Sequence, residues 1–349
     1  MKVLHVLASN SFSGAENVVC QIISMFESDA EVEMAYCCPE GKIREALAER
    51  GIKFLPISKL VVKELKYIIN SYKPDVIHAH DMRATFVVSR SCRNIPFVSH
   101  IHGNFAALNK FTIKSLAFSW ATRKAKHIFW VSRSSFDEYI FKSYVKKKSS
   151  ELRNVIDVDA LYDKMNRDEN TYFYDIVYLG RLTWEKNPER LIRVLRLVVD
   201  KMGEVRIAII GTGDLEAKTK QLAKQLGVDK NIDFLGFVSN PLKILHDAKV
   251  MIMTSIREGT PICALEALAL GTPIVSTPTD GLIELVEDCV DGFLNNEDDI
   301  LSSRLAEVIK EKDLCLRLSQ NAIEKSKTVN DKYAYCDKIS EQYTRLVRK

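Results

Sequence analysis

Short apolar runs alternate with helical segments from one end of the chain to the other, and this alternation limits the folds that the sequence can adopt. Each run is rich in β-branched or aromatic residues and ends near a polar residue or a glycine. The runs lie at residues 2–7, 32–37, 53–57, 75–80, 97–102, 127–132, 175–180, 206–211, 232–236, 250–255 and 273–277. The pattern predicts parallel sheets that helices cover on both faces.

The 349 residues are enough for two such cores. A polar and charged stretch at about residues 155–172 separates the strands of the first half from those of the second. We therefore expect an N-terminal Rossmann-like domain at residues 1–157 and a C-terminal one at residues 158–330. The last helical stretch, about residues 331–349, is a candidate to pack back on the first domain. The expected fold class is α/β, with two doubly wound domains facing each other across a cleft.

The composition is that of an ordinary globular protein, with 46% hydrophobic and 28% charged residues. No apolar run approaches the roughly 18 residues that cross a membrane, and the start MKVLHVLA does not resemble a signal peptide. Eight scattered cysteines without a CxxC spacing indicate reduced thiols rather than a disulfide framework or a zinc site. We therefore expect a cytoplasmic protein.

The stretch EGTPICALEALALGTPIV, residues 258–275, places Glu258 and Glu266 around the start of a buried helix. Pro261 fits the first turn, and the free N–H groups of Ile262 and Cys263 point out of the helix start, where the helix dipole attracts phosphate. Carboxylates accept hydrogen bonds from hydroxyl groups, so two acids beside an anion pocket suit a ligand with phosphates between two sugars. The alternative is that Glu266 is a surface acid and Glu258 an N-terminal charge.

A second stretch, YLGRLTWEKNPERLI, places Arg181 and Lys186 between a strand and the helix expected at residues 187–202. Two cations at the carboxyl end of a strand, beside a helix N-terminus, suit a diphosphate. Arg181 alone is more often a surface residue. Its combination with Lys186 and the two glutamates favours a binding site.

Gly14, in the sequence SGAE, lies at the first expected strand-to-helix turn, where a glycine lets a ligand approach the backbone closely. The turn does not follow the GxGxxG pattern, and the chain contains no GxxxxGK[ST] motif. These absences disfavour a dinucleotide-binding domain and an ATP-hydrolysing P-loop. The two glycines of IIGTGD fit a tight strand-to-helix turn.

Four histidines, His78, His80, His100 and His102, lie at the ends of two expected strands. No pair of them has an acid at a spacing typical of zinc sites, so we expect polar packing rather than a metal. His102, which precedes a glycine, is the one that we expect to face a ligand. The DVD sequence at residues 157–159 suggests a Mg²⁺-diphosphate site, but its place at the domain junction disfavours that interpretation.

These motifs together resemble those of retaining glycosyltransferases of the GT-B fold, family 4, also described as glycosyl transferases group 1. The similar pieces are SGAE, PDVIHAHD, SHIHG, VSRSS, RNVIDVD, YLGRLTWEKN, IIGTGD, FLGFV, REGTPICALEALALGTPIV and TDGLIELVEDCVDGFL. They follow the family order along nearly the whole chain. The most specific is the E-x7-E pair formed by Glu258 and Glu266.

The resemblance implies roles for the matched residues. The expected catalytic set is Arg181, Lys186, Glu258 and His102. The two cations hold the phosphates, Glu258 contacts hydroxyls of the transferred sugar, and His102 lies near the sugar ring. Glu266 would hold the donor ribose, Gly14 would bring backbone close to the diphosphate, and two residues would lie against the nucleobase. The full expected donor-binding set is Gly14, Phe237, Val238, Gly259, Thr260, Pro261, Ile262 and Glu266.

The implied reaction moves a hexose or an N-acetylhexosamine from a nucleotide diphospho-sugar, with retention at the anomeric carbon. We expect a UDP-sugar, because UDP is the commonest donor base in this group. No metal or other cofactor is expected. The implied acceptor is a saccharide or a lipid-linked saccharide in capsule, exopolysaccharide or lipopolysaccharide synthesis. The alternatives are a nucleotide-sugar epimerase or hydrolase of the same fold, and a non-catalytic nucleotide-sugar-binding partner of another transferase.

A basic segment in the first half suggests a further partner. Residues 101–150 contain ten lysines and arginines against two acids, although the whole chain carries a net charge of only +4. Within it, residues 109–126 interleave apolar and basic side chains, which suits a helix on an anionic surface at the inner face of the cell membrane. The alternative is a core-facing stripe with a solvated rim. No nucleic-acid-binding motif accompanies the charge, so nucleic acid is not expected.

Overall fold

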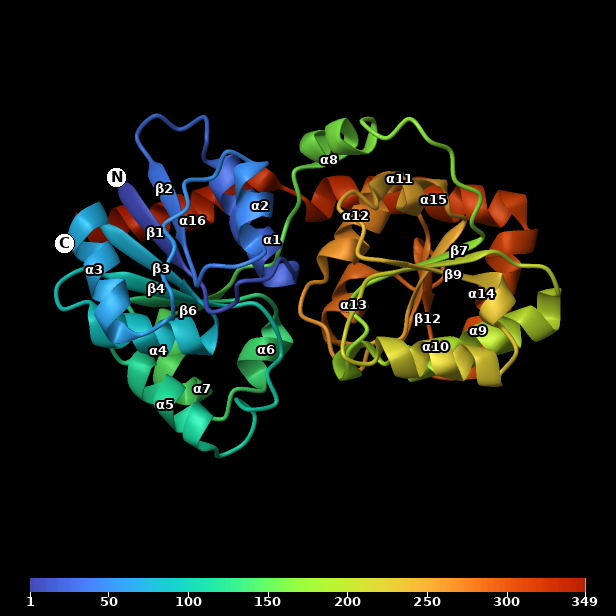
Figure 1. Ribbon diagram of the computed structural model, residues 1–349, viewed down its shortest axis with the longest axis horizontal. Coiled ribbons are helices and arrows are strands. Elements are labelled where there is room, and N and C mark those ends of the chain that lie inside the picture. Colours follow the sequence, from blue (N-terminus) through green and yellow to red (C-terminus); the bar gives the residue numbers. More distant parts are fainter. Residues whose placement is uncertain (349) are drawn as a thin grey trace. The chain divides into compact units, whose positions relative to one another are not determined.

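The computed structural model describes residues 1–348 and divides the chain into two compact units. The first contains Met1–Asn154 together with the C-terminal segment that begins at Lys332, and the second contains Val155–Asp331. The units meet three residues before the boundary that the polar stretch suggested. Each unit is built around one sheet with helices on both faces (Figure 1).

The sheet of the N-terminal unit has six parallel strands in the order β2-β1-β3-β4-β5-β6. Their bounds are β1 (Lys2–Val6), β2 (Glu33–Cys37), β3 (Val76–His80), β4 (Phe97–Ile101), β5 (His127–Trp130) and β6 (Ser149–Glu151). Every residue of β3 and β4 is buried, as expected for central strands covered on both faces.

The helices of the N-terminal unit form two layers. One layer holds α3 (Val62–Tyr72), α4 (Asp81–Ser91) and α5 (Ile113–Thr122), and the other holds α1 (Gly14–Met25), α2 (Ile43–Ala48) and α16 (Lys332–Val347) (Figure 1). Two short helices, α6 (Arg133–Asp137) and α7 (Lys142–Val145), and the 3-10 turn Lys146–Lys148 lie between β5 and β6. The last helix of the chain thus packs in the first unit, where Tyr343 bonds to His78 on β3 through its hydroxyl at 2.6 Å.

The sheet of the C-terminal unit also has six parallel strands, in the order β12-β11-β10-β7-β8-β9. The bounds are β7 (Ile176–Leu179), β8 (Ile207–Ile210), β9 (Ile232–Gly236), β10 (Val250–Met253), β11 (Ile274–Ser276) and β12 (Gly292–Leu294). The chain winds outward in one direction from β7 and in the other from β10. In open sheets of this kind, ligands bind beyond the carboxyl ends of the two strands where the order reverses.

Helices again cover both faces of this second sheet. On one face lie α9 (Pro188–Met202), α10 (Glu216–Gln225) and α14 (Asp298–Lys310), and on the other lie α11 (Leu242–Asp247), α12 (Ile262–Leu270) and α15 (Lys312–Val329) (Figure 1). The remaining elements are α8 (Val158–Met165), α13 (Asp280–Leu285) and the 3-10 turns Trp184–Lys186 and Asp229–Asn231.

The helix α9 forms as its sequence predicts. Asn187 adopts a left-handed backbone with a φ of 52° and accepts a hydrogen bond from the Arg190 N–H through its side chain. Pro188 occupies the first helical position, and one apolar stripe is buried. The helix α12 is apolar on nearly all sides, because it lies between the sheet and α15, and it ends at Gly271 with a φ of 73°.

Ten of the eleven expected strands are present, and the expectation for residues 53–57 is wrong. That segment makes only two isolated bridges, Tyr36 to Phe54 and Pro39 to Ile57. Leu55 and Ile57, on either side of Pro56, donate to the Tyr36 and Cys38 carbonyls at 2.8 and 3.1 Å, so the segment runs beside β2 and its extension without forming a continuous ladder. The pattern also missed β6 and β12, whose three residues each are too few to show alternation.

Among the described residues, no helix is long and apolar enough to cross a membrane.

The position of α16 leads to a stability prediction. Tyr343 is fully buried, whereas Tyr333 on the same helix is 75% exposed. The substitution Tyr343→Ala should lower the free energy of unfolding of the N-terminal unit by about 3–5 kcal/mol, because it leaves a cavity and an unpaired imidazole nitrogen. Tyr333→Ala is the matched control and should change it by less than about 0.5 kcal/mol. Chemical denaturation, followed by the fluorescence of the buried Trp130, measures both, and equal losses would contradict the packing of α16.

Candidate functional site

The candidate site of the C-terminal unit is built from the loops that follow β7 and β10, the two strands at the point where the strand order reverses. These loops are tied to each other by backbone. The Ile256 N–H donates to the Glu185 carbonyl at 2.8 Å, and the Thr254 hydroxyl donates to the Lys186 carbonyl at 3.3 Å. The two stretches that the sequence singled out, far apart in the chain, therefore form one structure.

A buried ion pair joins the same two loops. The Lys186 ammonium lies 2.5 Å from an oxygen of Glu258, and the two side chains are only 17% and 8% exposed. The Ser255 hydroxyl donates to the same carboxylate oxygen at 2.6 Å. An ammonium group has three N–H donors, so Lys186 can hold Glu258 and still bond a second anion.

The charge on Lys186 depends on this pairing. Burial is the largest single influence and opposes that charge, but attraction to Glu258, the hydrogen bond with it and a contribution from Cys263 together raise the pKa of Lys186 above its ordinary value. The lysine is therefore a fixed cation at the carboxyl ends of β7 and β10.

A second cation, Arg181, lies in the loop after β7 and is exposed. Within residues 1–348, no hydrogen bond or ion pair holds its guanidinium, and only its backbone carbonyl is bonded, by the Tyr178 hydroxyl at 3.0 Å. Its positive charge reaches Lys186 and opposes protonation there. An exposed arginine beside a buried lysine offers two donors to one anionic ligand.

The start of α12 lies in the loop after β10. Pro261 is the N-cap, and no side chain caps the helix. The backbone N–H groups of Ile262 and Cys263 make no hydrogen bond within the described chain, which leaves donors for an anion at the positive end of the helix. The preceding loop residues Gly259 and Thr260 are buried.

Backbone packing fixes the position of that loop. A Cβ atom at Gly281, in the first turn of α13, would lie 1.3 Å from the Gly259 carbonyl oxygen. Only a glycine permits this approach, so the requirement is steric and does not depend on a special φ. The start of α13 thereby holds the turn that carries Glu258 and leads into α12.

Glu266 lies on the second turn of α12 and is partly buried. Its carboxylate makes no hydrogen bond or ion pair to any residue of the described range. Burial raises the pKa of Glu266 to about 7, against a smaller lowering by the charge of Lys164. The carboxylate thus has acceptor capacity that the fold leaves unused.

The two residues predicted to contact a nucleobase follow β9. Phe237 is 65% exposed, a large value for an aromatic side chain, and Val238 is partly exposed. They lie at the same carboxyl edge of the sheet as Arg181 and Glu258, two strands away from β7. An exposed ring at this edge offers a flat apolar face for stacking.

The arrangement at this edge has a definite chemical capacity. Two cations and the start of α12 can hold phosphate groups. Glu258 and Glu266 can accept hydrogen bonds from hydroxyl groups of a polyol. A ligand that combines a diphosphate with sugars would meet both sets of groups.

In the N-terminal unit, Gly14 begins α1, the helix after β1, and His102 follows β4, which β3 separates from β1 in the sheet. Gly14 is exposed at the start of α1, and a Cβ atom built on it would have nothing within 4 Å. Packing within the described chain therefore does not require a glycine there. His102 bonds to His80 at 2.8 Å, and burial lowers its pKa to about 3.

Two histidine groups in this unit could hold a metal ion. They are His5 with His78 and His80, and His80 with His100 and His102, each with ring nitrogens within 4.8 Å of one another. Neither group includes a carboxylate. His80 belongs to both, and its two ring nitrogens already bond to His5 and His102 at 2.9 and 2.8 Å. A metal at either group would have to break one of those bonds, so the geometry favours a hydrogen-bonded network.

Two other features do not contribute to a site. Asp157, the first acid of DVD, caps α8 by accepting a hydrogen bond from the Ala160 N–H at 3.3 Å, which gives it a structural role.

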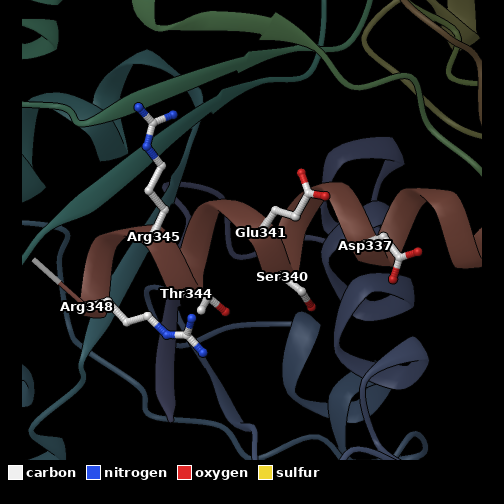
Figure 2. Close-up of a pocket in the computed structure, with 6 residues that line it drawn as sticks. All are labelled: Asp337, Ser340, Glu341, Thr344, Arg345 and Arg348. Atoms are coloured by element: carbon white, nitrogen blue, oxygen red, sulfur yellow. The ribbon is translucent and has the colours of Figure 1, made fainter.

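An open hollow along α16 contains none of the predicted residues and is bounded by charges of both signs from one helix (Figure 2). Its lining residues are Asp337, Ser340, Glu341, Thr344, Arg345 and Arg348.

Sequence reasoning missed the residues that support the candidate site. Ser255 bonds to Glu258, and Gly281 holds the turn before α12. Ser255 could have been noticed as a small polar residue three positions before the glutamate. Gly281 was visible in TDGLIELVED, but nothing local shows which backbone it contacts.

The raised pKa of Glu266 generates a prediction. Folding favours the neutral acid, so its contribution to stability is complete below about pH 4.5 and is lost as the pH rises towards 7. Glu266→Gln should therefore raise the melting temperature at pH 8 by several degrees, and the gain should shrink towards zero at pH 4.5. Thermal unfolding across this range measures the effect, with the exposed Glu204→Gln as control. A gain that does not change with pH would show that Glu266 is not held neutral.

Comparison with known proteins agrees with this geometry. Residues 12–160 match the family model described as Glycosyltransferase Family 4, and residues 163–325 match that described as Glycosyl transferases group 1. A glycosyltransferase of Methanocaldococcus jannaschii is 30% identical over 249 residues, which cover 65% of this chain and 63% of that protein. The aligned region thus spans less than two thirds of that relative's length.

Two further proteins match nearly end to end. The UDP-Gal:alpha-D-GlcNAc-diphosphoundecaprenol alpha-1,3-galactosyltransferase of Escherichia coli is 24% identical and aligns with 99% of this chain and 97% of its own length. The crystal structure of Anabaena HepE in complex with UDP-glucose superposes with a TM-score of 0.85 at 20% identity, covering 99% of this chain and all of the other. With these matches to both units and the two parallel sheets, the chain belongs to glycosyltransferase family 4 and has the GT-B fold.

Proposed function

We propose that the protein is a retaining glycosyltransferase that moves a hexose or an N-acetylhexosamine from a UDP-sugar to a saccharide or lipid-linked saccharide in surface polysaccharide synthesis. One observation carries the proposal. Lys186, Arg181 and the uncapped start of α12 lie at the carboxyl ends of β7 and β10, where the strand order of the second sheet reverses, with Glu258 bonded to Lys186 and Glu266 on the second turn of α12. This is the charge pattern of a diphosphate with a sugar on each side.

In the proposed complex, the phosphates of the donor contact Arg181, Lys186 and the N–H groups at the start of α12. Glu258 and Glu266 accept hydrogen bonds from the transferred sugar and the ribose, respectively, and Phe237 with Val238 contacts the uracil. Gly259, Thr260 and Pro261 shape the turn against the phosphate and the sugar. In the N-terminal unit, which we propose binds the acceptor, Gly14 offers exposed backbone to a phosphate group and His102 contacts a sugar ring.

The proposed rate enhancement comes from stabilising the leaving group. The bond between the anomeric carbon and the diphosphate oxygen breaks while a bond to the acceptor hydroxyl forms on the same face of the sugar. The acceptor proton passes to the departing diphosphate, so atoms and charge balance without a protein nucleophile. Lys186 and Arg181 neutralise the negative charge that develops on the diphosphate, which is the role that a metal ion has in other enzymes. The reaction therefore needs no metal.

The relatives support the choice of donor and acceptor. The Escherichia coli relative is named for UDP-galactose and a diphosphoundecaprenol-linked sugar, and a Campylobacter jejuni relative for a similar lipid-linked acceptor. The Anabaena structure with the same fold contains UDP-glucose. The eight free cysteines suit a reducing compartment, and we propose that the protein acts in the cytoplasm, at the inner face of the cell membrane.

An exposed part of the N-terminal unit supports contact with that membrane. We call it the α5 surface; it consists of the apolar side chains Phe86, Phe111, Ile113, Leu116 and Trp120, of which Ile113 is 87% and Phe111 70% exposed. Other residues of α5, such as Phe118 and Ala121, face the core, so the segment predicted from sequence has both a core side and an exposed apolar side.

Basic groups lie beside the α5 surface. The side chains of Arg90 and Lys124 lie over the Trp120 ring, at 5.5 and 5.4 Å from its centre. Lys114 is exposed on the helix itself. Exposed apolar side chains with basic groups beside them suit a bilayer with anionic lipids.

The donor proposal predicts the result of a binding experiment. UDP-sugars should raise the melting temperature of the wild-type protein in the presence of EDTA, while GDP- and ADP-sugars should raise it less. Arg181→Ala should weaken donor binding about 10- to 100-fold, because it removes a charge-assisted contact to phosphate. Arg317→Ala, an exposed arginine on α15, is the control and should bind normally. Thermal shift titrations measure all of these.

The outcomes separate the alternatives. Loss of the shift on adding EDTA would contradict the metal-free mechanism. Free sugar or an epimer formed without acceptor would indicate a hydrolase or an epimerase. Binding without turnover of any lipid-linked or soluble saccharide would indicate a non-catalytic partner of another transferase.

The α5 surface predicts membrane binding that depends on lipid charge. The protein should co-sediment with vesicles that contain phosphatidylglycerol, and much less with phosphatidylcholine alone or at high salt. Ile113→Glu should reduce binding at least about five-fold, because it places a charge among the inserted side chains. Tyr67→Glu, at a 74% exposed position on α3, is the matched control. Equal binding by both variants would exclude this surface.

A further inference from the structure

Three histidines and one methionine form a continuous chain of hydrogen bonds through the N-terminal sheet. The His102 Nε2 atom lies 2.8 Å from His80 Nδ1, and His80 Nε2 lies 2.9 Å from His5 Nδ1. His5 Nε2 lies 3.4 Å from the sulfur of Met34. The chain crosses four elements: the segment after β4, then β3, β1 and β2.

The rings are well aligned for these bonds. The centres of His5 and His80 are 5.2 Å apart with 17° between their planes, and those of His80 and His102 are 5.0 Å apart with 20°. In each pair, the distance between ring centres exceeds the N···N distance by about the sum of the two ring radii, measured from ring centre to nitrogen. The bonded rings therefore lie edge to edge and nearly in one plane, so each N–H points at the lone pair of the next ring.

Each imidazole in the chain is neutral. Burial lowers the pKa of His5 and of His102 to about 3 and that of His80 well below its ordinary value, and neighbouring imidazoles lower the pKa of His5 and of His80 further. A neutral imidazole carries one proton, on one nitrogen, and accepts at the other. Three protons thus serve three hydrogen bonds, and all must point the same way along the chain.

Met34 decides that direction. A thioether sulfur can only accept a hydrogen bond, so the proton of His5 must be on Nε2, facing the sulfur. His5 Nδ1 then accepts from His80 Nε2, and His80 Nδ1 accepts from His102 Nε2. In the opposite arrangement the lone pair of His5 would face the sulfur without a donor, at a buried position.

The last atom of the chain is His102 Nδ1. It is buried and has no hydrogen-bond partner among the described residues. We propose that His5 and His80 are positioning residues that hold His102 in the Nε2–H tautomer, so that its Nδ1 lone pair accepts a hydrogen bond from a hydroxyl group of the sugar substrate. The assignment of the sugar as the donor of this bond rests on the proposed function, whereas the tautomer follows from the chain of bonds alone.

The neighbouring histidines do not belong to this chain. His78 bonds through Nδ1 to Tyr343, and neither nitrogen of His100 has a bonded partner within the described range. Their rings lie against the chain members: His78 stacks on His80 with ring centres 4.2 Å apart, and His100 lies tilted by 34° against His102 with ring centres 4.0 Å apart. Their contribution is to exclude water from the chain, which keeps the tautomers fixed.

The first experiment observes the tautomers directly. The full-length protein is labelled with ¹⁵N in its histidine rings, and long-range ¹H–¹⁵N correlation spectra at neutral pH distinguish protonated from unprotonated nitrogens. We expect the proton on Nε2 in His5, His80 and His102. A proton on Nδ1 of His102, or a mixture of both forms, would overturn the proposal.

A variant tests whether Met34 sets the direction. Met34→Leu keeps the apolar volume but removes the acceptor, so the two directions of the chain become closer in energy and His102 should show both tautomers in its spectrum. Met251→Leu, which changes a buried methionine in the other unit, is the matched control and should leave the histidine spectrum unchanged. An unaltered His102 signal in Met34→Leu would overturn the role of the sulfur. The change is conservative, so we expect the variant to fold and the spectrum to report on the chain.

The ligand arm separates this inference from the proposed function. When a UDP-sugar that raises the melting temperature is added, the His102 Nδ1 signal should shift in a saturable manner. In a separate kinetic assay, Met34→Leu should lower kcat/KM for transfer about two- to ten-fold, mostly through a lower kcat. A bound donor and acceptor that leave this signal unmoved would overturn the role of His102 as an acceptor. Failure of every nucleotide sugar to bind would contradict the proposed function, while the tautomer result would still decide the chain.

Discussion

The ion pair between Lys186 and Glu258 organises the C-terminal unit at the point where its strand order reverses. It joins the loops after β7 and β10, which also exchange backbone hydrogen bonds. Net stability is a poor explanation for such a pair, because removing two charges from water costs as much as their attraction returns. Its effect is to keep a lysine charged and fixed beside the start of α12, ready for an anion. The exposed Arg181 and the unpaired Glu266 have the same character, since the fold leaves their bonding capacity unused.

Parallel sheets explain why these groups meet. Every strand of each sheet runs in the same direction, so all the loops that follow strands emerge at one edge. Residues 181, 186, 237, 258 and 266 are distributed over 86 positions of sequence but all belong to loops or helix starts at that edge. Steric detail then completes the arrangement: the missing Cβ of Gly281 allows α13 to press on the turn at Gly259, and this contact fixes where α12 begins.

The sequence predicted what depends on local pattern. The periodicity of α9 and its cap at Asn187 are encoded within a few residues, and the structure agrees with both, whereas Pro261, expected in the first turn of α12, is the N-cap one residue before it. The prediction failed where the outcome depends on partners far away. The segment at 53–57 has the composition of a strand but makes only isolated bridges to Tyr36 and Pro39, and the short β6 and β12 become strands only because a neighbouring strand offers its edge. Of the candidate site, the charged groups were predictable from type and spacing, whereas Ser255 and Gly281 act through contacts that no local pattern contains.

The histidines show the same limit most clearly. The two HxH sequences in β3 and β4 are visible in the sequence as a pair, but His5 is the single histidine of an apolar strand more than seventy residues earlier. Only the register of the sheet, which places His5 opposite His78 and His80 opposite His100, brings the five rings together. Because the rings contact one another and are buried from water, they do not titrate independently. The sulfur of the buried Met34 on β2 accepts the hydrogen bond at one end of the chain, and this sets the direction of every hydrogen bond in it. Through His5 and His80, Met34 thus determines which nitrogen of His102 is left unprotonated.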